Sequence, residues 1–275
     1  MLIKPDFFDT FRCIASACEH TCCAGWEIDV DEDTAAFYET LSGEDGAFVR
    51  ARLTACEDGY RLCEEGERCG FLREDGLCEL ILRLGDGALC EICREHPRFY
   101  TGDGGVTLAG QGLVCEEAAR LWLAKMPEFV AEDDGEAVEE WAAEELSALM
   151  EALRDPAAIL PEEIPQEEYH RLRTLYASLE AMDPAYPARY AEMPPRLSDP
   201  RLAGLAAYFL FRYWFELGGE TAAMFAAASC VMIAALGGEL CDAARLYSGE
   251  VEYDTDNVAR VCDFLEDGLC GCFMR

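Results

Sequence analysis

The chain has 275 residues, of which 51% are hydrophobic, and a formal net charge of −33. This length and apolar content allow a sizeable buried core, so the fold need not depend on disulfides. The 55 acidic residues against 22 basic ones leave no basic patch to neutralise phosphates. We therefore expect no nucleic-acid partner and no anionic membrane partner, whereas a cationic group such as a lysine side chain would be attracted.

The N-terminal sequence MLIKPDFFDTFRC, residues 1–13, lacks the apolar segment of a signal peptide. The longest apolar run, residues 221–236, is short for a membrane span and predicts a buried helix. We therefore expect a cytoplasmic protein whose thiols stay reduced. In that compartment disulfide bridging is the least expected role for the 16 cysteines, behind metal binding and redox chemistry.

Short elements are predicted in the first part of the chain. WEIDV, residues 26–30, alternates apolar and polar side chains and predicts a short strand. Residues 30–41 predict a helix that is capped by Asp31 or Asp33. RFYTGDGGVTLAG, residues 98–110, predicts a β-hairpin around Gly-Asp-Gly-Gly.

The rest of the chain predicts helices over residues 115–126, 136–155, 202–217, 220–236 and 256–268. Residues 202–217 are apolar almost all round and should be buried, with residues 220–236 as their antiparallel partner. The aromatic stripe within the first of these helices predicts core packing rather than a cofactor site: Tyr208, Phe211, Tyr213 and Trp214.

We expect a mainly α fold in which a cysteine-rich, metal-centred N-terminal half with a short β-hairpin packs on a helical C-terminal half. The division is placed at residues 1–125 and 126–275, because Pro127 and an acidic run interrupt the pattern there. The apolar surplus of the helical half needs cover, so the two halves are expected to form one compact unit.

Cysteines dominate the N-terminal half, where 11 of the 16 lie between Cys13 and Cys115. FRCIASACEHTCCAGW, residues 11–26, carries four of them, and Cys90 and Cys93 have the C-x2-C spacing of a metal-binding turn or a redox dithiol. Nine are candidate ligands: Cys13, Cys18, Cys22, Cys23, Cys69, Cys78, Cys90, Cys93 and Cys115.

All-thiolate ligands suit zinc or an iron–sulfur cluster, and four thiolates complete one site of either kind. Nine candidates exceed one site, so a second metal, outer-shell thiols and buried apolar cysteines all remain open. The C-x3-C-x2-C signature of radical S-adenosylmethionine enzymes fails, because Gly25 stands at its third cysteine position. Six of the seven remaining cysteines are expected outside the site, in a polar loop, in the core or in the tail: Cys56, Cys63, Cys230, Cys241, Cys270 and Cys272.

Other side chains near these cysteines are candidates for cofactor binding. Arg94 and Arg98 flank Pro97 and could neutralise a thiolate cluster or hold a carboxylate, or form surface salt bridges. Trp26 could be a cofactor or substrate platform, although core packing is the commoner role of such a residue. His20 and His96 could be ligands or outer-shell groups.

The sequence resembles the flagellin lysine-N-methylase family, which is related to bacterial cysteine-cluster proteins described as zinc- or iron-chelating. The matching stretches are CIASACEHTCCAGWEIDVDEDT, RCGFLREDGLCEL, LGDGALCEICREHPRFY and LVCEEAARLWL. Weaker matches continue into YFLFRYWF and RLYSGEVEYDTDNV. Two positions depart from the family's pattern, since His96 replaces an aromatic residue and Phe99 replaces a histidine.

The resemblance implies a protein-lysine N-methyltransferase that acts on flagellin with S-adenosylmethionine and contains an iron–sulfur cluster, most simply 4Fe-4S, with zinc as the alternative metal. It also sorts the candidate ligands. The wider cysteine-cluster proteins share Cys18, Cys22, Cys23, Cys69, Cys78 and Cys93, and the methylase-like subset adds Cys13, Cys90 and Cys115.

Methyl transfer needs a neutral amine, so an acceptor must take the lysine proton. The sequence offers many carboxylates and tyrosines and singles out none as this base. No Rossmann glycine motif is present in the required context. Two other classes of function stay open: a non-catalytic metal-binding or metal-sensing protein, and a thiol redox protein that uses Cys90 and Cys93.

Overall fold

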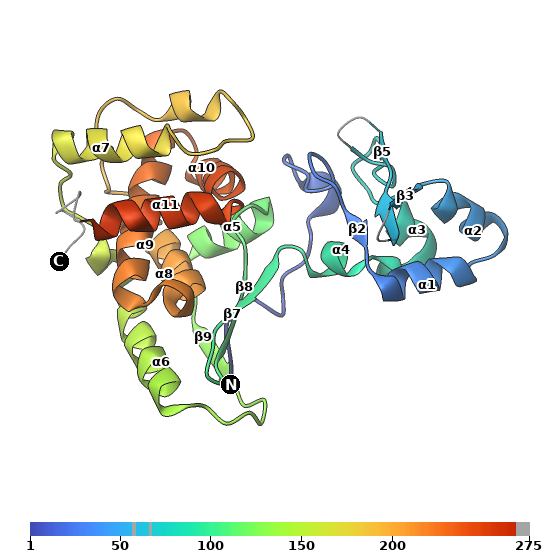
Figure 1. The fold of residues 1–275 in the computed structure, drawn as a ribbon, viewed down its shortest axis with the longest axis horizontal. Coiled ribbons are helices and arrows are strands. Elements are labelled where there is room, and N and C mark those ends of the chain that lie inside the picture. The colour runs from blue at the N-terminus through green and yellow to red at the C-terminus, as the bar shows by residue number, and fades with distance from the viewer. Residues whose placement is uncertain (57–58, 66–67, 268–275) are drawn as a thin grey trace. The chain divides into compact units, whose positions relative to one another are not determined.

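A computed structural model describes residues 1–56, 59–65 and 68–267. The described chain is mainly α-helical with short strands, as expected (Figure 1). It divides into two compact units, which we call the cysteine-rich unit (residues 12–97) and the helical unit (residues 1–11 and 98 onward). The expected boundary near residue 125 coincides with neither junction. Whether the two units pack as one body stays a prediction.

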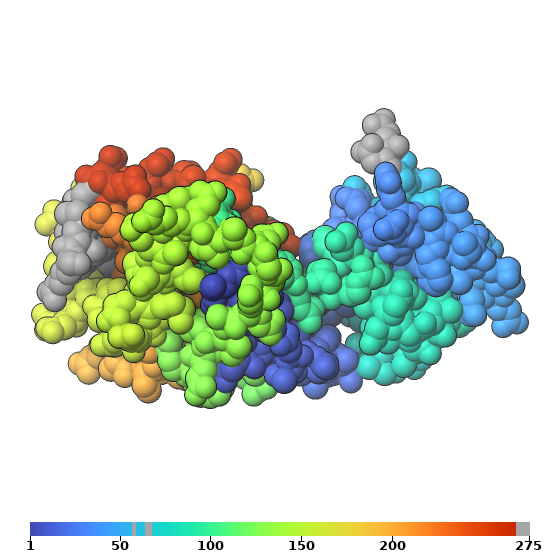
Figure 2. All heavy atoms as spheres, turned by 90° about the horizontal axis from the view of Figure 1, so that it is seen from below, coloured from blue at the N-terminus to red at the C-terminus, as the bar shows by residue number. Residues whose placement is uncertain are grey.

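The helical unit contains a four-stranded sheet in the order β7-β8-β1-β9. β1 pairs parallel with β8 and antiparallel with β9, which joins the N-terminus to segments more than a hundred residues away. In Figure 2 dark-blue N-terminal residues are seen among yellow-green residues from the middle of the chain. The antiparallel β7–β8 pair confirms the predicted hairpin. The strands are β1 (Leu2–Pro5), β7 (Arg98–Thr101), β8 (Thr107–Gln111) and β9 (Phe129–Glu132).

Helices follow this sheet and confirm the predicted pattern. They are α5 (Glu116–Ala124), α6 (Glu140–Ala152), α7 (Gln166–Tyr176), α8 (Leu202–Leu217), α9 (Gly219–Leu236), α10 (Leu240–Tyr247) and α11 (Thr255–Glu266), with 3-10 turns η3 (Pro156–Ile159) and η4 (Tyr186–Arg189) and a π-helical turn η5 (Ser248–Glu252). α9 has the length and composition of a membrane span, but 67% of it is buried inside the unit, as expected of a core helix.

The centre of the helical unit is the α8–α9 pair, which is separated by a single residue, Gly218, at φ 78°. Most residues of both helices are fully buried, so no polar face is needed. Gly204 lets α8 approach α5, because a Cβ at this position would lie 2.2 Å from the Trp122 carbonyl oxygen. The aromatic stripe on α8 lies in this core, as predicted.

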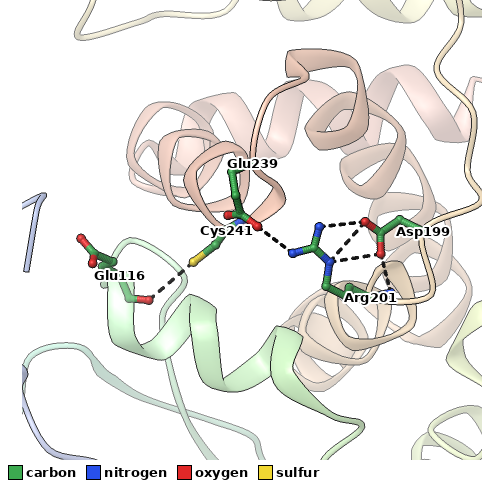
Figure 3. A network of polar contacts seen from close by, with 5 residues as sticks. All are labelled: Glu116, Asp199, Arg201, Glu239 and Cys241. Carbon is green, nitrogen blue, oxygen red and sulfur yellow. Dashed lines mark hydrogen bonds and ion pairs between the residues drawn. The ribbon is translucent and has the colours of Figure 1, made fainter.

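A polar network ties the start of α8 to α10 and α5 (Figure 3). Arg201 holds Asp199 at 2.9 Å and Glu239 at 2.6 Å. Glu239 caps α10 by accepting the Cys241 N–H at 2.6 Å. The Cys241 thiol in turn donates to the Glu116 carbonyl oxygen at 3.7 Å, so this cysteine has a structural role near the core.

The cysteine-rich unit is built from much shorter elements. A three-stranded sheet has the order β2-β4-β3, and β5 pairs with β6. The strands are β2 (Asp29–Val30), β3 (Leu53–Cys56), β4 (Gly59–Leu62), β5 (Glu64–Glu65) and β6 (Arg68–Cys69). The helices are η1 (Ala15–Ala17), α1 (Glu32–Thr40), α2 (Gly43–Arg50), α3 (Glu79–Leu84), η2 (Asp86–Ala88) and α4 (Glu91–Glu95). The strand expected over residues 26–30 is therefore shortened to its last two residues.

Candidate metal centre in the cysteine-rich unit

Six of the nine candidate ligands lie in one electrostatically connected group within the cysteine-rich unit. The thiol of Cys23 interacts with those of Cys69, Cys78 and Cys93, and Cys90 interacts with Cys78 and Cys93. Cys22 joins the group through a hydrogen bond to Cys23. We call this group the thiol cluster: Cys22, Cys23, Cys69, Cys78, Cys90 and Cys93.

Backbone geometry brings these cysteines together from three parts of the unit. The Cys69 N–H donates to the Cys23 carbonyl oxygen at 2.9 Å, which fixes the N-terminal loop against β6. Cys78 is the N-cap of α3 and pairs with Leu72 in an isolated bridge. Cys90 is the N-cap of α4, and Cys93 follows within that helix.

Three of these cysteines receive backbone hydrogen bonds on their sulfur atoms. The N–H groups of Phe71 and Leu72 are directed at Cys69, and those of Leu80 and Ile81 at Cys78. The N–H of Cys93 is directed at Cys90. Hydrogen bonds of this kind stabilise a thiolate, and outer-shell donors of the same kind orient ligands around bound metals.

Two adjacent cysteines form a thiol–thiolate pair. A hydrogen bond from Cys22 lowers the pKa of Cys23 to about 6 against the opposing effect of burial. The Thr21 hydroxyl and the positive charge of Arg68 act in the same direction. Cys23 is therefore largely a thiolate at neutral pH.

The C-x2-C turn forms a second pair. The Cys93 thiol donates to Cys90, which lowers the pKa of Cys90 to about 7. The same hydrogen bond, together with burial and the nearby charge of Cys90, raises the pKa of Cys93. Burial raises the pKa of Cys69 to about 11, and it also raises that of Cys78. The cluster thus combines thiolates with thiols that need a cation to release their protons.

The donor set has the chemistry of a zinc or iron–sulfur site, but its geometry is open. Among the described residues, no group of three or more His, Cys, Asp or Glu side chains converges as ligands of one metal ion would. The 14 described cysteines are free thiols. A metal held here would have to draw these thiols inward, as expected where metal binding and folding are coupled.

The other three candidate ligands have different surroundings. Cys13 is exposed, and its sulfur accepts the Ala15 N–H at 3.3 Å. Cys18 ends the 3-10 turn η1 by donating its N–H to the Ala15 carbonyl oxygen at 3.0 Å. Cys115 is the N-cap of α5 in the helical unit, and its predicted role as a ligand stays a prediction.

Among the cysteines that the sequence placed outside the site, Cys230 and Cys241 belong to the core or pack against it, as expected. Cys56 was expected in a polar loop and instead ends a strand. Cys230 is fully buried between the core helices, and Cys262 is buried on α11. Cys56 is exposed on β3. Cys270 and Cys272 lie outside the described residues.

Trp26 lies beside the thiol cluster. Its indole N–H donates to the Cys22 carbonyl oxygen at 2.5 Å, and its ring packs 5.5 Å from the His96 ring. Burial lowers the pKa of His96, whose Nε2 is buried without a hydrogen-bond partner among the described residues. Trp26 is also packed against the core of this unit, so it closes one side of the cysteine loop.

The two candidate arginines belong to different units. Arg94 donates to the Leu89 carbonyl oxygen at 3.3 Å and lies 3.9 Å from the Glu95 carboxylate. Arg98 belongs to β7 of the helical unit, where its guanidinium lies over the rings of Phe8 and Phe11. The prediction that both arginines bind a cofactor is not tested by these contacts.

Two residues that support the cluster were not predicted as site residues, although Asp31 was expected as a helix cap. Asp31 caps α1 through the Thr34 N–H at 2.9 Å and also accepts the Glu91 N–H at 2.7 Å, which fixes the start of α4 beside Cys90. The Tyr38 hydroxyl donates to the Ala88 carbonyl oxygen at 2.7 Å. Burial raises the pKa of Tyr38, and so do the nearby thiols of Cys90, Cys93 and Cys78. The aspartate cap was a visible signal for Asp31; Tyr38 had none.

Comparisons with known proteins give matches over part of the chain. The chain is 34% identical over 110 residues to the flagellar biosynthetic protein FliU of Salmonella muenchen, covering 35% of this chain and 62% of that protein. It is 33% identical over 110 residues to a lysine-N-methylase of Salmonella choleraesuis, with 26% of that protein covered. A lysine-N-methylase of Salmonella typhimurium is 32% identical over the same length.

These similarities support the resemblance to the flagellin lysine-N-methylase family. The chain spans less than two thirds of the length of each of these relatives. No family model matches the chain, and no solved structure gives a significant match. What these relatives' names imply for the activity, substrate and cofactors of this chain belongs to the proposal below.

Proposed function

We propose that this protein is a protein-lysine N-methyltransferase that acts on flagellin with S-adenosylmethionine as the methyl donor. The observation that carries the proposal is the similarity to two proteins named lysine-N-methylase and to a flagellar biosynthetic protein. The net charge of −33 adds modest support, because it attracts lysine-bearing partners. A cytoplasmic location fits both the donor and the abundance of free thiols.

We further propose that the thiol cluster holds an iron–sulfur cluster or a zinc ion. The support is its donor chemistry: six sulfur atoms, two thiolate-forming pairs, and backbone N–H groups directed at three of the sulfurs. A bound metal of this kind would supply positive charge and a rigid cross-link between the N-terminal loop, β6, α3 and α4. The small apolar core of the unit gives a cross-link a clear structural benefit.

The experiment that tests the catalytic proposal is mass spectrometry of flagellin from the same cell after incubation with anaerobically purified protein and S-adenosylmethionine. We expect added methyl masses on lysines in reactions with the protein and none without it. A protein that retains its metal, receives the donor and leaves flagellin unmodified would instead be a metal-binding protein without methylase activity.

The metal proposal has its own test. Metal analysis and a visible absorption spectrum of anaerobically purified protein distinguish iron–sulfur from zinc. A metal-free protein whose Cys90 and Cys93 readily form a disulfide would favour the thiol redox function. The hydrogen bond between these two thiols brings them close to each other, so they are the pair expected to form that disulfide.

A further inference from the structure

The helical unit contains a buried carboxylate with only one of its two oxygens satisfied. Glu252, the last residue of the π-helical turn η5, has a side chain that is 1% exposed. Its Oε1 accepts the Tyr208 hydroxyl at 2.9 Å and the Tyr213 hydroxyl at 3.0 Å. The Arg212 Nε lies 3.6 Å from the same oxygen. Its Oε2 is buried and has no hydrogen-bond partner among the described residues.

Burying half of a carboxylate without a donor is costly, so the second oxygen calls for a ligand. A nearby glutamate shows the contrast. Glu250, on the same turn, uses both oxygens: Oε2 accepts the Met182 N–H at 2.7 Å, and both accept the Asp183 N–H at 3.3 Å. Glu250 therefore has a structural role, because both of its oxygens accept backbone N–H groups. Glu252 differs, because its Oε2 accepts no hydrogen bond from a described residue.

The surroundings of Glu252 already hold one cation on Oε1, the Arg212 guanidinium, and leave Oε2 as an acceptor without a donor among the described residues. The Arg212 guanidinium lies 4.9 Å from the centre of the Phe99 ring and within 6 Å of those of Tyr208 and Tyr213. The aromatic faces therefore hold Arg212, and a ligand at Oε2 must supply an N–H or O–H donor. Arg212 has a side chain that is 25% exposed, so the cluster reaches the surface through this residue.

We propose that Glu252 binds the primary ammonium of the substrate lysine through its Oε2 and takes its proton. This inference rests on the proposed methyltransferase function and adds the base that the sequence could not identify. The lysine Nζ–H bond breaks and the proton passes to Oε2. The freed lone pair then forms the N–C bond while the C–S bond of the sulfonium donor breaks, and the neutral thioether leaves. The proton on Glu252 returns to solvent, which restores the carboxylate.

Two tyrosine hydroxyls and the Arg212 guanidinium fix the position of the Glu252 carboxylate. Burial raises the pKa values of Tyr208 and Tyr213, and the Glu252 charge adds to this, so both phenols stay protonated as donors. Burial lowers the pKa of Arg212, but the Glu252 charge and the hydrogen bond to Tyr208 outweigh it and raise the pKa, so the guanidinium stays charged. Among the described residues, the titratable groups that contact Glu252 are Tyr208, Arg212 and Tyr213, which all lie on α8.

The test compares Glu252→Gln with Glu250→Gln, two identical changes on one helical turn. Methyl transfer is measured at saturating donor against pH. For Glu252→Gln we expect a loss on the order of 100-fold at neutral pH that recovers at high pH, where lysine loses its own proton. Glu250→Gln should keep the wild-type pH profile. A Glu252→Gln variant that folds and keeps the wild-type rate and profile, or one that loses only donor affinity, would overturn the proposal.

Two further measurements keep the test decisive. Tyr213→Phe keeps the ring but removes one donor to Oε1, so the rate of methyl transfer at neutral pH should change while the fold is kept. This variant serves if Glu252→Gln does not fold because Arg212 has lost its partner. Calorimetry with n-butylammonium as the probe reports on the site without any reaction. Binding that weakens at least tenfold in Glu252→Gln and not in Glu250→Gln supports the site even if no methylation of flagellin is found. Equal or absent binding by the wild type and both variants contradicts it.

Discussion

The two units of this protein achieve order in different ways. The described core of the helical unit contains 47 buried residues, and α8 and α9 alone supply about half of them. The described core of the cysteine-rich unit contains ten, one of which is Cys90. A core of that size supports little stability by hydrophobic burial alone. The helical unit therefore has many buried aliphatic and aromatic side chains, whereas the cysteine-rich unit has few of these and a cluster of thiols. If the thiols bind a metal, that cross-link would stabilise the smaller core.

Loss of one thiol should therefore have the largest effect of any single change. We expect Cys22→Ser, Cys78→Ser and Cys93→Ser each to lower metal affinity by more than about 100-fold, because even outer-shell changes at metal sites cost 10–100-fold. Amide hydrogen exchange should then lose protection across residues 12–97 while α8 and α9 stay protected. Metal content and exchange are measured on the same anaerobic samples.

The matched control is Cys56→Ser, because Cys56 is exposed on β3. The interactions described for Cys69, Cys78 and Cys93 do not include Cys56. It should retain metal and protection. Full metal retention by all three cluster variants would show that the thiol cluster is not the metal site.

The second prediction approaches the comparison from the helical unit. Phe225 is fully buried on α9 and packs edge-on against Phe209 and Tyr213. Phe225→Ala should lower the free energy of unfolding by about 3–5 kcal/mol, the usual cost of a large cavity in a packed core. Metal content should not change. Phe37→Ala, at a phenylalanine that is 41% exposed on α1, is the control and should cost far less.

A Phe225→Ala variant that lost its metal would contradict the expectation that metal binding is independent of the helical core. It would show that the order of the cysteine-rich unit depends on the helical core. Denaturant unfolding followed by tryptophan fluorescence, with metal analysis before unfolding, makes the measurement.

The sequence predicted the helical unit better than the cysteine-rich one, for physical reasons. α8 was placed at its observed bounds because a sixteen-residue segment that is apolar almost all round predicts a buried helix. β9 was missed, and a domain boundary was placed on it instead. Pro127 and the acidic run suggested a linker there, but Phe129–Glu132 pairs with β1 from the other end of the chain, and such long-range pairing leaves no local signal.

The candidate site shows the same limit. The sequence alone pointed to the cysteines, because nine candidate ligands in two groups are dense enough to stand out. Spacing could not find that Cys23 lies among Cys69, Cys78 and Cys93, since this depends on the Cys69–Cys23 backbone hydrogen bond. Nor could it separate Glu252 from the other acidic residues, because only burial and partners distinguish it.

The third prediction concerns Asp31, which joins α1 to the start of α4. Burial raises the pKa of Asp31, but hydrogen bonds from the backbone of Glu91 and Thr34 outweigh burial and lower it. Asp31→Ala should cost about 1 kcal/mol, the usual value of a helix cap. Since the folded-state pKa is depressed, this contribution is present above the unfolded value near 4 and is lost as pH falls through the folded value.

Thermal unfolding between pH 3 and pH 7 measures this contribution. The difference between wild type and Asp31→Ala should be constant above about pH 5 and should shrink toward low pH. Asp33→Ala is the control, because Asp33 is exposed in the first turn of α1 and the cap contacts belong to Asp31. A difference that grew on acidification would contradict the assigned cap.

The smallest effect is expected from a surface ion pair in the same unit. Arg73 and Asp75 are 2.7 Å apart, but both are about half exposed, so solvent screens their attraction. Arg73→Gln should therefore leave the thermal midpoint and the metal content within experimental error at physiological salt. The pair lies in the turn between Leu72 and Cys78, which makes it a strict test. If removing this charge released metal, the turn rather than the thiols would control the order of the unit. If it does not, thiol chemistry is the property that separates the cysteine-rich unit from the helical one.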